Sequence, residues 1–162
     1  MKNKKLTHID TAGNPSMVDI SEKTPSRRIA RAQAVVVLGE QVMCLLAEND
    51  IQTKKGPVFQ SAIIAGVMGA KKTSDLIPLC HPIPLEDCQV SIVPNRDEVV
   101  ITTSAVTTSK TGVEMEALTA ASVAALTVYD MCKAIGSGIR IKEIRLLEKR
   151  GGKTDYVAST DS

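Results

Sequence analysis

An aspartate and a lysine, Asp130 and Lys133, lie three positions apart near the end of a long apolar segment. On a helix, residues three apart are neighbours, so these two side chains can serve as a coupled acid and base. An ordinary surface ion pair has the same spacing and adds little to stability. The spacing alone therefore leaves a catalytic and a structural interpretation open.

Two glutamates, Glu114 and Glu116, lie near the start of the same segment. Thr111 and Glu114 have the spacing of a capping box with Thr111 as the N-cap, and Glu116 can simply favour the positive end of the helix dipole. Glu116 and Asp130 would lie within about 40° of one helix face but about 21 Å apart along the axis. If both act in one small-molecule site, we expect two chains to contribute.

Two adjacent lysines, Lys54 and Lys55, precede Gly56 and Pro57. Because proline suits the first turn of a helix, the ammonium groups are expected beside a helix N-terminus, where backbone N–H groups also favour anions. A phosphate or carboxylate clamp and a solvated basic turn are equally compatible with this pattern, and either lysine can be the functional one.

The segment Leu79-Cys80-His81-Pro82 holds one of the two histidines of the chain. A loop stiffened by prolines fixes a side chain at low entropic cost, which suits a general acid, a general base or a substrate ligand. A lone histidine in a loop is nonetheless more often a bystander.

The basic segment between Lys149 and Lys153 can close over phosphates or be an ordinary solubilising tail. The sequence has no CxxC or HxxxH pair to supply a zinc site. It also has no GxxxxGK[ST] or GxGxxG loop, so nothing indicates a P-loop or dinucleotide-binding enzyme. No metal or cofactor is therefore expected.

The elements that must position these residues follow from hydrophobic periodicity and from the prolines and glycines. One domain is predicted over 1–162, with an irregular arm over 1–26 that has an extended piece at 17–20, and a flexible polar tail over 151–162. Helices are expected at 39–49, from Pro57 to about Lys72, and at 113–134, whereas 73–85 is a proline loop. Strands are expected at 34–38, with a start as early as Arg28, and at 88–92, 99–108 and 139–147. This order predicts an α+β fold, the ferredoxin-like split βαβ pattern with an antiparallel sheet and an added helix.

The composition excludes several classes of protein. Aromatic residues are only 2% of the 162 residues and the formal net charge is +2, which argues against a nucleic-acid-binding protein. No apolar run approaches the roughly 20 residues that span a bilayer, and we expect no signal peptide because no apolar run follows the basic N-terminal residues. The four cysteines are widely spaced, as in a reduced cytoplasmic protein.

The predicted helix at 113–134 is apolar on two sides, and we therefore expect it to be buried on two sides. One stripe suits packing on a sheet and consists of Val113, Ala117, Ala120, Ala124, Val128 and Met131. The second lies roughly opposite and consists of Met115, Leu118, Ser122, Ala125, Leu126 and Tyr129. In a domain with one sheet, the second stripe is expected to meet another subunit.

Two long segments, 74–82 and 110–134, closely resemble the MoaC family of cyclic pyranopterin monophosphate synthases in molybdenum cofactor biosynthesis. The resemblance extends from Leu6–Ile9 and Met17–Ile20 to Gly151–Lys153. It implies a lyase that converts 3′,8-cyclo-7,8-dihydroguanosine 5′-triphosphate, derived from GTP, into cyclic pyranopterin monophosphate with loss of diphosphate. It also implies a homohexamer with sites between subunits. The alternative is a non-catalytic, oligomeric nucleotide-binding module.

The resemblance also implies roles for individual residues. The catalytic positions correspond to Asp130, Lys133 and Lys55, although Lys54 stays an alternative to Lys55. Cationic neighbours are expected to lower the pKa of Lys133 toward neutrality. The substrate-binding positions correspond to Leu79, Cys80, His81, Glu114, Met115, Glu116, Lys149 and Lys153.

Overall fold

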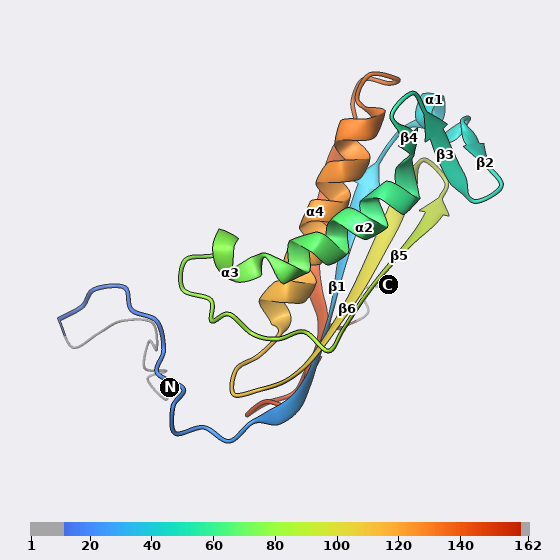
Figure 1. The fold of residues 1–162 in the computed structure, drawn as a ribbon. Helices are drawn as coiled ribbons and strands as arrows, with labels where there is room; N and C mark the ends of the chain where they lie inside the picture. Colours follow the sequence, from blue (N-terminus) through green and yellow to red (C-terminus); the bar gives the residue numbers. More distant parts are fainter. Residues whose placement is uncertain (1–11, 160–162) are drawn as a thin grey trace.

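Five antiparallel strands form the main sheet of this protein, whose computed structural model describes residues 12–159 (Figure 1). The elements in chain order are β1 (Ser26–Val37), α1 (Glu40–Met43), β2 (Leu46–Ala47), β3 (Asp50–Thr53), β4 (Gly56–Pro57), α2 (Val58–Lys71), α3 (Thr73–Leu76), β5 (Asp87–Asn95), β6 (Glu98–Ser109), α4 (Glu114–Cys132), β7 (Arg140–Arg150) and β8 (Tyr156–Val157).

The strand order in the main sheet is β5-β6-β1-β7-β8, with β1 in the centre. Residues of β1 alternate between the two faces, and Ala30, Ala32, Ala34 and Val36 are fully buried on the face toward the helices. The hairpin β5–β6 and the helix α4 then lead to β7 on the other side of β1. This is the predicted ferredoxin-like antiparallel arrangement, and the prediction is confirmed.

The helices α2 and α4 pack against each other and cover one face of the sheet (Figure 1). Small residues allow this close approach: a Cβ on Gly69 would lie 2.7 Å from Cγ2 of Val123, and one on Gly66 would lie 3.0 Å from the Ala120 carbonyl oxygen. The Thr103 hydroxyl donates to the Ala117 carbonyl at 2.8 Å and ties α4 to β6. A core with almost no aromatic residues is thus well packed because the helices and the sheet lie close together.

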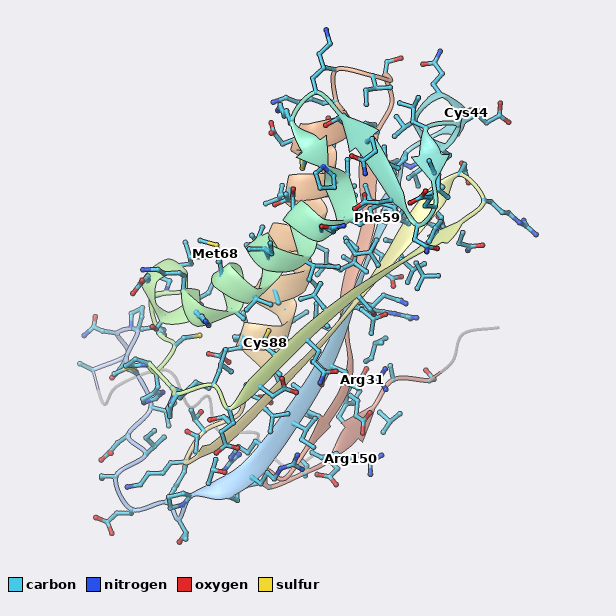
Figure 2. The ribbon with its side chains drawn as sticks, turned by 45° about the vertical axis from the view of Figure 1, so that its right-hand side comes forward. Arg31, Cys44, Phe59, Met68, Cys88 and Arg150 are labelled. Atoms are coloured by element: carbon cyan, nitrogen blue, oxygen red, sulfur yellow. The ribbon has the colours of Figure 1, made fainter. Side chains whose placement is uncertain are left out.

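The two apolar stripes of α4 differ in burial. All six residues of the stripe predicted to face the sheet are buried, as expected. Of the second stripe, Ala125 is buried, whereas Met115, Leu126 and Tyr129 are exposed. On α2, Met68 likewise points away from the sheet while Phe59 is buried (Figure 2).

The prediction of a helix over 39–49 is wrong for most of that range. Only α1 is helical, and β2, β3 and β4 follow as a small three-stranded sheet. Glu48 adopts a positive φ of 58° and the Asn49 N–H donates to the Ala47 carbonyl, so the chain turns back here. The apolar residues that suggested a helix are not all buried, since Leu45 is 42% exposed.

Two smaller expectations also need correction. The predicted tail contains β8, which pairs with β7 at Glu148↔Val157 and Lys149↔Tyr156. The proline loop begins with the short helix α3. Residues 17–20 belong to an irregular segment, as expected for the arm, and the expectations for Leu6–Ile9 and for the ends of the arm and the tail lie outside the described residues.

Candidate active site

A cavity of about 530 Å³ opens at the start of α4. This volume is typical of sites for small molecules. All eight residues predicted to bind substrate line it, although they come from three separate segments: Leu79, Cys80, His81, Glu114, Met115, Glu116, Lys149 and Lys153. The cavity also takes in residues that sequence reasoning missed, namely Val18, Ile20, Lys23, Thr111 and Gly112.

The start of α4 presents Glu114 and Glu116 to this cavity, but the predicted capping box is absent. Val113 is the N-cap, no side chain caps it, and Glu114 is the first helical residue rather than the third. The Glu114 carboxylate instead pairs with the Lys149 ammonium at 3.0 Å. Gly112 makes room for it, because a Cβ there would lie 1.8 Å from Oε2 of Glu114.

Glu116 is the one glutamate in the described chain that is buried, with 4% of its surface exposed. Burial raises the pKa of this carboxyl to about 7, and the nearby charge of Glu114 adds to the increase. Burial and the charge of Glu116 raise the pKa of the Cys80 thiol. The floor of the cavity thus holds a carboxyl group that exchanges a proton near neutral pH.

The loop that carries His81 is fastened to the sheet. The Cys80 N–H donates to the Ile77 carbonyl at 3.1 Å, and the Thr107 hydroxyl of β6 donates to the Pro84 carbonyl at 2.6 Å. The Glu86 N–H then donates to the Val106 carbonyl at 2.9 Å, just before β5 begins. These bonds hold His81 at the cavity wall.

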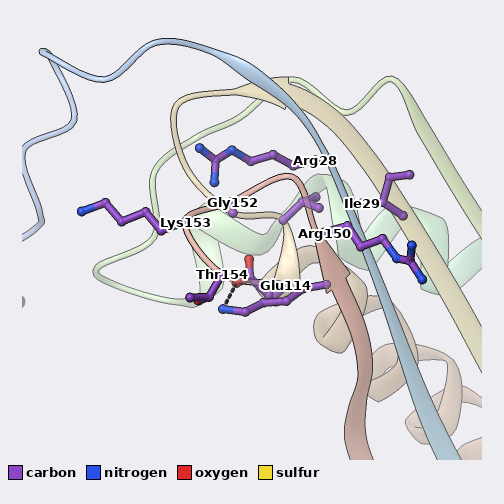
Figure 3. Close-up of a pocket in the computed structure, with 10 residues that line it drawn as sticks. Arg28, Ile29, Glu114, Arg150, Gly152, Lys153 and Thr154 are labelled. Carbon is purple, nitrogen blue, oxygen red and sulfur yellow. Dashed lines mark hydrogen bonds and ion pairs between the residues drawn. The ribbon is translucent and has the colours of Figure 1, made fainter. Parts of the chain in front are cut away.

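A basic arm and a basic turn border the cavity. The Lys110 ammonium donates to the Ser21 carbonyl at 2.7 Å, which holds the segment with Lys23 beside the cavity. A smaller adjoining cavity of about 110 Å³ lies under the turn after β7 and includes Arg28 and Lys153 (Figure 3). Anionic groups bound here would meet several cations from different segments.

Arg28 is a further residue that sequence reasoning missed. Its guanidinium donates to the carbonyls of Ser109 and Lys110, at 3.0 and 3.4 Å, which orients it toward the small cavity. The turn beside it requires Gly151, whose φ is +82° and whose Cβ would lie 2.0 Å from the Arg27 carbonyl oxygen. Only the pair of basic residues at the start of β1 signals this site in the sequence.

The second cluster of predicted site residues lies at the other end of α4. Asp130 accepts hydrogen bonds from the Lys133 ammonium at 2.7 Å on Oδ1 and from the Lys55 ammonium at 2.7 Å on Oδ2. All three side chains are about half exposed. The structure therefore brings Lys55, rather than Lys54, to the pair of Asp130 and Lys133.

The electrostatics of this cluster differ from expectation in one respect. The hydrogen bonds from Lys133 and Lys55 lower the pKa of Asp130 to about 2. The same contact raises the pKa of Lys133, which was predicted to fall, because the partner nearest to it is an anion rather than a cation. In the free protein both groups are thus held in their charged forms.

The helix N-terminus behind Lys55 is not available to a phosphate. The Asp50 carboxylate already accepts hydrogen bonds from the N–H groups of Phe59 and Gln60, at 2.7 and 3.1 Å. These are the second and third residues of α2. The expected anion site therefore exists, but an acidic side chain of the same chain occupies it.

Comparison with known proteins identifies this arrangement of residues. The sequence profile described as the MoaC family matches residues 17–152. The chain belongs to the MoaC family. It is similar to a cyclic pyranopterin monophosphate synthase from Rhodospirillum rubrum, with 51% identity over 151 residues that cover 92% of this chain and 90% of that protein. The MoaC match includes the Asp130 cluster and every residue that lines the larger cavity except Lys153.

Among residues 12–159, no three or more His, Cys, Asp or Glu side chains gather closely enough to hold a metal ion. Within the same described part, no helix has the length and apolar character needed to cross a membrane.

Proposed function

We propose that this protein is a cyclic pyranopterin monophosphate synthase of molybdenum cofactor biosynthesis. The observation that supports it most directly is the cavity at the start of α4, which gathers all eight expected binding residues in a chain 51% identical to such a synthase. The proposed reaction converts 3′,8-cyclo-7,8-dihydroguanosine 5′-triphosphate into cyclic pyranopterin monophosphate. An internal hydroxyl displaces diphosphate from the innermost phosphate, which gives a cyclic phosphate and makes the enzyme a lyase.

The cavity suits both ends of this substrate. Lys149 and Lys153 lie where they can hold the triphosphate, with Arg28 and Lys23 nearby. Cations placed at the phosphates also stabilise the negative charge that develops on departing diphosphate. His81 and Glu116 face the same cavity and can bind the purine-derived ring. A carboxyl group with a pKa of about 7 can donate a hydrogen bond when protonated and accept one when ionised.

Asp130, Lys133 and Lys55 are proposed as the acid–base group. Rebuilding the ring requires protons to leave and join nitrogen and oxygen atoms, and a paired carboxylate and ammonium can exchange them. Exposed ion pairs of this kind contribute little to stability, so substrate can displace one partner easily. Lys55 is then free to exchange the Asp130 carboxylate for a phosphate oxygen.

We propose that each active site combines two chains. Asp130 follows Glu116 by fourteen residues on α4, which corresponds to about 21 Å along the helix. The exposed apolar residues Met115, Leu126 and Tyr129 offer a surface that a second copy would cover. A homohexamer built from such dimers would place the Asp130 cluster of one chain at the cavity of another.

A cytoplasmic location is proposed on the basis of the cysteines. Cys44, Cys80, Cys88 and Cys132 are all free thiols, the state that a reducing compartment maintains.

Incubation of the purified protein with the cyclic triphosphate tests the proposed function, with diphosphate and cyclic pyranopterin monophosphate as the measured products. We expect both products to form together in equal amounts. A nucleotide-binding module would hold the substrate and leave it unchanged, and that result would overturn the proposal.

A further inference from the structure

The hairpin of β3 and β4 joins the ends of two helices. At its base, the Asp50 carboxylate binds the N-terminus of α2 through the N–H groups of Phe59 and Gln60. At its tip, the Lys55 ammonium binds the C-terminus of α4 through the carbonyl and the carboxylate of Asp130, at 3.1 and 2.7 Å. An acid on the positive helix end and a base on the negative end each match the helix dipole.

Asp50 is well placed to fix this hairpin. Its side chain is 8% exposed, and Oδ1 also accepts the N–H of Ile51 at 2.6 Å. The N-cap of α2 is Pro57, which has no side-chain acceptor, so Asp50 satisfies N–H groups that a neighbouring cap normally satisfies. The helix thus obtains its cap from a strand, and the strand is held against the helix in return.

Only a short turn separates this anchor from Lys55. Thr53 stiffens it, since its hydroxyl donates to the Gly56 carbonyl and accepts the Lys55 N–H, both at 3.1 Å. Gln52 and Thr53 of β3 also pair with Pro57 and Gly56 of β4. The backbone of Lys55 is therefore fixed from Asp50 onward, and only its side chain has to reach Asp130.

We infer that Asp50 is a positioning residue, which holds the backbone of the Lys55 turn so that the Lys55 ammonium meets the Asp130 carboxylate. This inference rests on the proposed function, in which Lys55 and Asp130 act on the substrate. It adds to that function the buried carboxylate of Asp50, which lies outside both the cavity and the Asp130 cluster. A residue that only capped α2 would stabilise the helix and leave the Lys55–Asp130 contact unchanged.

The test compares Asp50→Ala with Asp50→Ala/Pro57→Asp. An aspartate at position 57 restores a cap from the N-cap position itself but does not restore the bond between β3 and α2. We expect the double variant to recover the melting temperature. It should keep a kcat about 10- to 100-fold below the original protein, with KM little changed, as expected when reacting groups are misplaced.

The pKa of the Asp130 carboxyl, followed by NMR titration of the free protein, gives a measurement that does not depend on activity. It is about 2 when both lysines bind Asp130, and Lys55→Ala should raise it. Asp50→Ala should raise it in the same direction. The control is Ile101→Val, which shortens a buried side chain in β6. It should lower the stability of the protein without raising the pKa of Asp130.

Either of two results would overturn the inference. An unchanged Asp130 pKa in Asp50→Ala, or a kcat restored together with the melting temperature by Pro57→Asp, would show that Asp50 is only a helix cap. If Asp50→Ala does not fold, Asp50→Asn keeps one acceptor oxygen for the Phe59 N–H, and the same criteria apply to it. If the original protein releases no diphosphate, the proposed function fails, while the Asp130 pKa still tests the role of Asp50.

Discussion

The Lys55 ammonium lies 2.7 Å from the Asp130 carboxylate, although the two residues are 75 positions apart in the chain. Asp130 receives a second ammonium from Lys133, one helical turn further along its own helix. A carboxylate with two cations is strongly held in its ionised form, as its pKa of about 2 indicates. The relationship makes this surface cluster a group of three charged side chains from two segments rather than an isolated helical ion pair.

Replacing Asp130 by asparagine should lower kcat for diphosphate release by about 100- to 10,000-fold, the range typical of lost acid–base catalysis. The melting temperature should change little, because the cluster is exposed and surface ion pairs contribute little. The measurement is steady-state kinetics together with thermal unfolding.

Asp75→Asn supplies the matched control for this substitution. Asp75 also lies three residues from its lysine on the surface, with Lys72 at 3.4 Å. It lines neither of the two cavities at the start of α4. Equal loss of activity in both variants would mean that Asp130 has only a structural role.

Mixing two inactive variants should restore activity if each site combines two chains. His81→Ala damages the cavity, and Asp130→Ala damages the cluster at the other end of α4. In mixed dimers with twofold symmetry, one of the two sites has neither substitution, so about a quarter of the original activity should return after subunit exchange. The assay is diphosphate release after unfolding and refolding the mixture. A mixture as inactive as its parents, despite proven exchange, would indicate that both ends of α4 serve a site within one chain.

Gly112→Ala should weaken substrate binding with little effect on stability. A Cβ at this position would lie 1.8 Å from Oε2 of Glu114, the flexible end of a side chain, so the glutamate can swing away and leave Lys149. Glu114 is one of the residues proposed to bind substrate, and loss of a charge-assisted hydrogen bond from it to the substrate corresponds to about 1.5–3 kcal/mol, or roughly a 10- to 150-fold rise in the dissociation constant.

A double-mutant cycle with Glu114→Ala checks this explanation, with the dissociation constant measured by calorimetry on a non-reacting substrate analogue. If the alanine acts through Glu114, Gly112→Ala should have almost no further effect in the Glu114→Ala background. Additive effects would mean that the added methyl group acts on the cavity directly.

The main elements of the fold could be predicted because their signals are local. The alternating residues of β1 and the long apolar stripe of α4 both lie on the buried face that periodicity indicates. The small sheet of β2, β3 and β4 could not be predicted in this way. Its two- to four-residue strands depend on contacts such as that of Asp50 with α2, which are visible only once the chain has folded.

The residues of the site also differ in whether the sequence alone could predict them. Those that lie within long motifs, such as His81 and Glu116, were expected from resemblance, and the structure gathers them in one cavity. Arg28 and Lys23 lie outside those motifs, and their proximity to the cavity depends on how β1 and the arm pack. The pKa of Glu116 also depends on packing, because burial in the folded structure is the main cause that raises it.

Glu116 should make the stability of the protein depend on pH. Its pKa is raised from 4.5 to about 7 by burial, so the folded state keeps the proton that the unfolded state loses above pH 4.5. The stabilisation is therefore complete below pH 4.5 and is lost as the pH rises toward 7. A full proton difference corresponds to about 1.4 kcal/mol per pH unit, or roughly 3 kcal/mol across this window.

Glu116→Gln should remove this dependence, since the amide is a neutral group of the same shape. We expect the variant to match the original protein near pH 4.5 and to exceed it in stability at pH 8, as measured by urea unfolding at both pH values. Glu114→Gln is the control, because Glu114 is less buried at the same end of α4 and pairs with Lys149. Equal pH dependence in Glu116→Gln and the original protein would mean that Glu116 is ionised throughout. Its part in the site would then be that of a permanent anion rather than a proton donor.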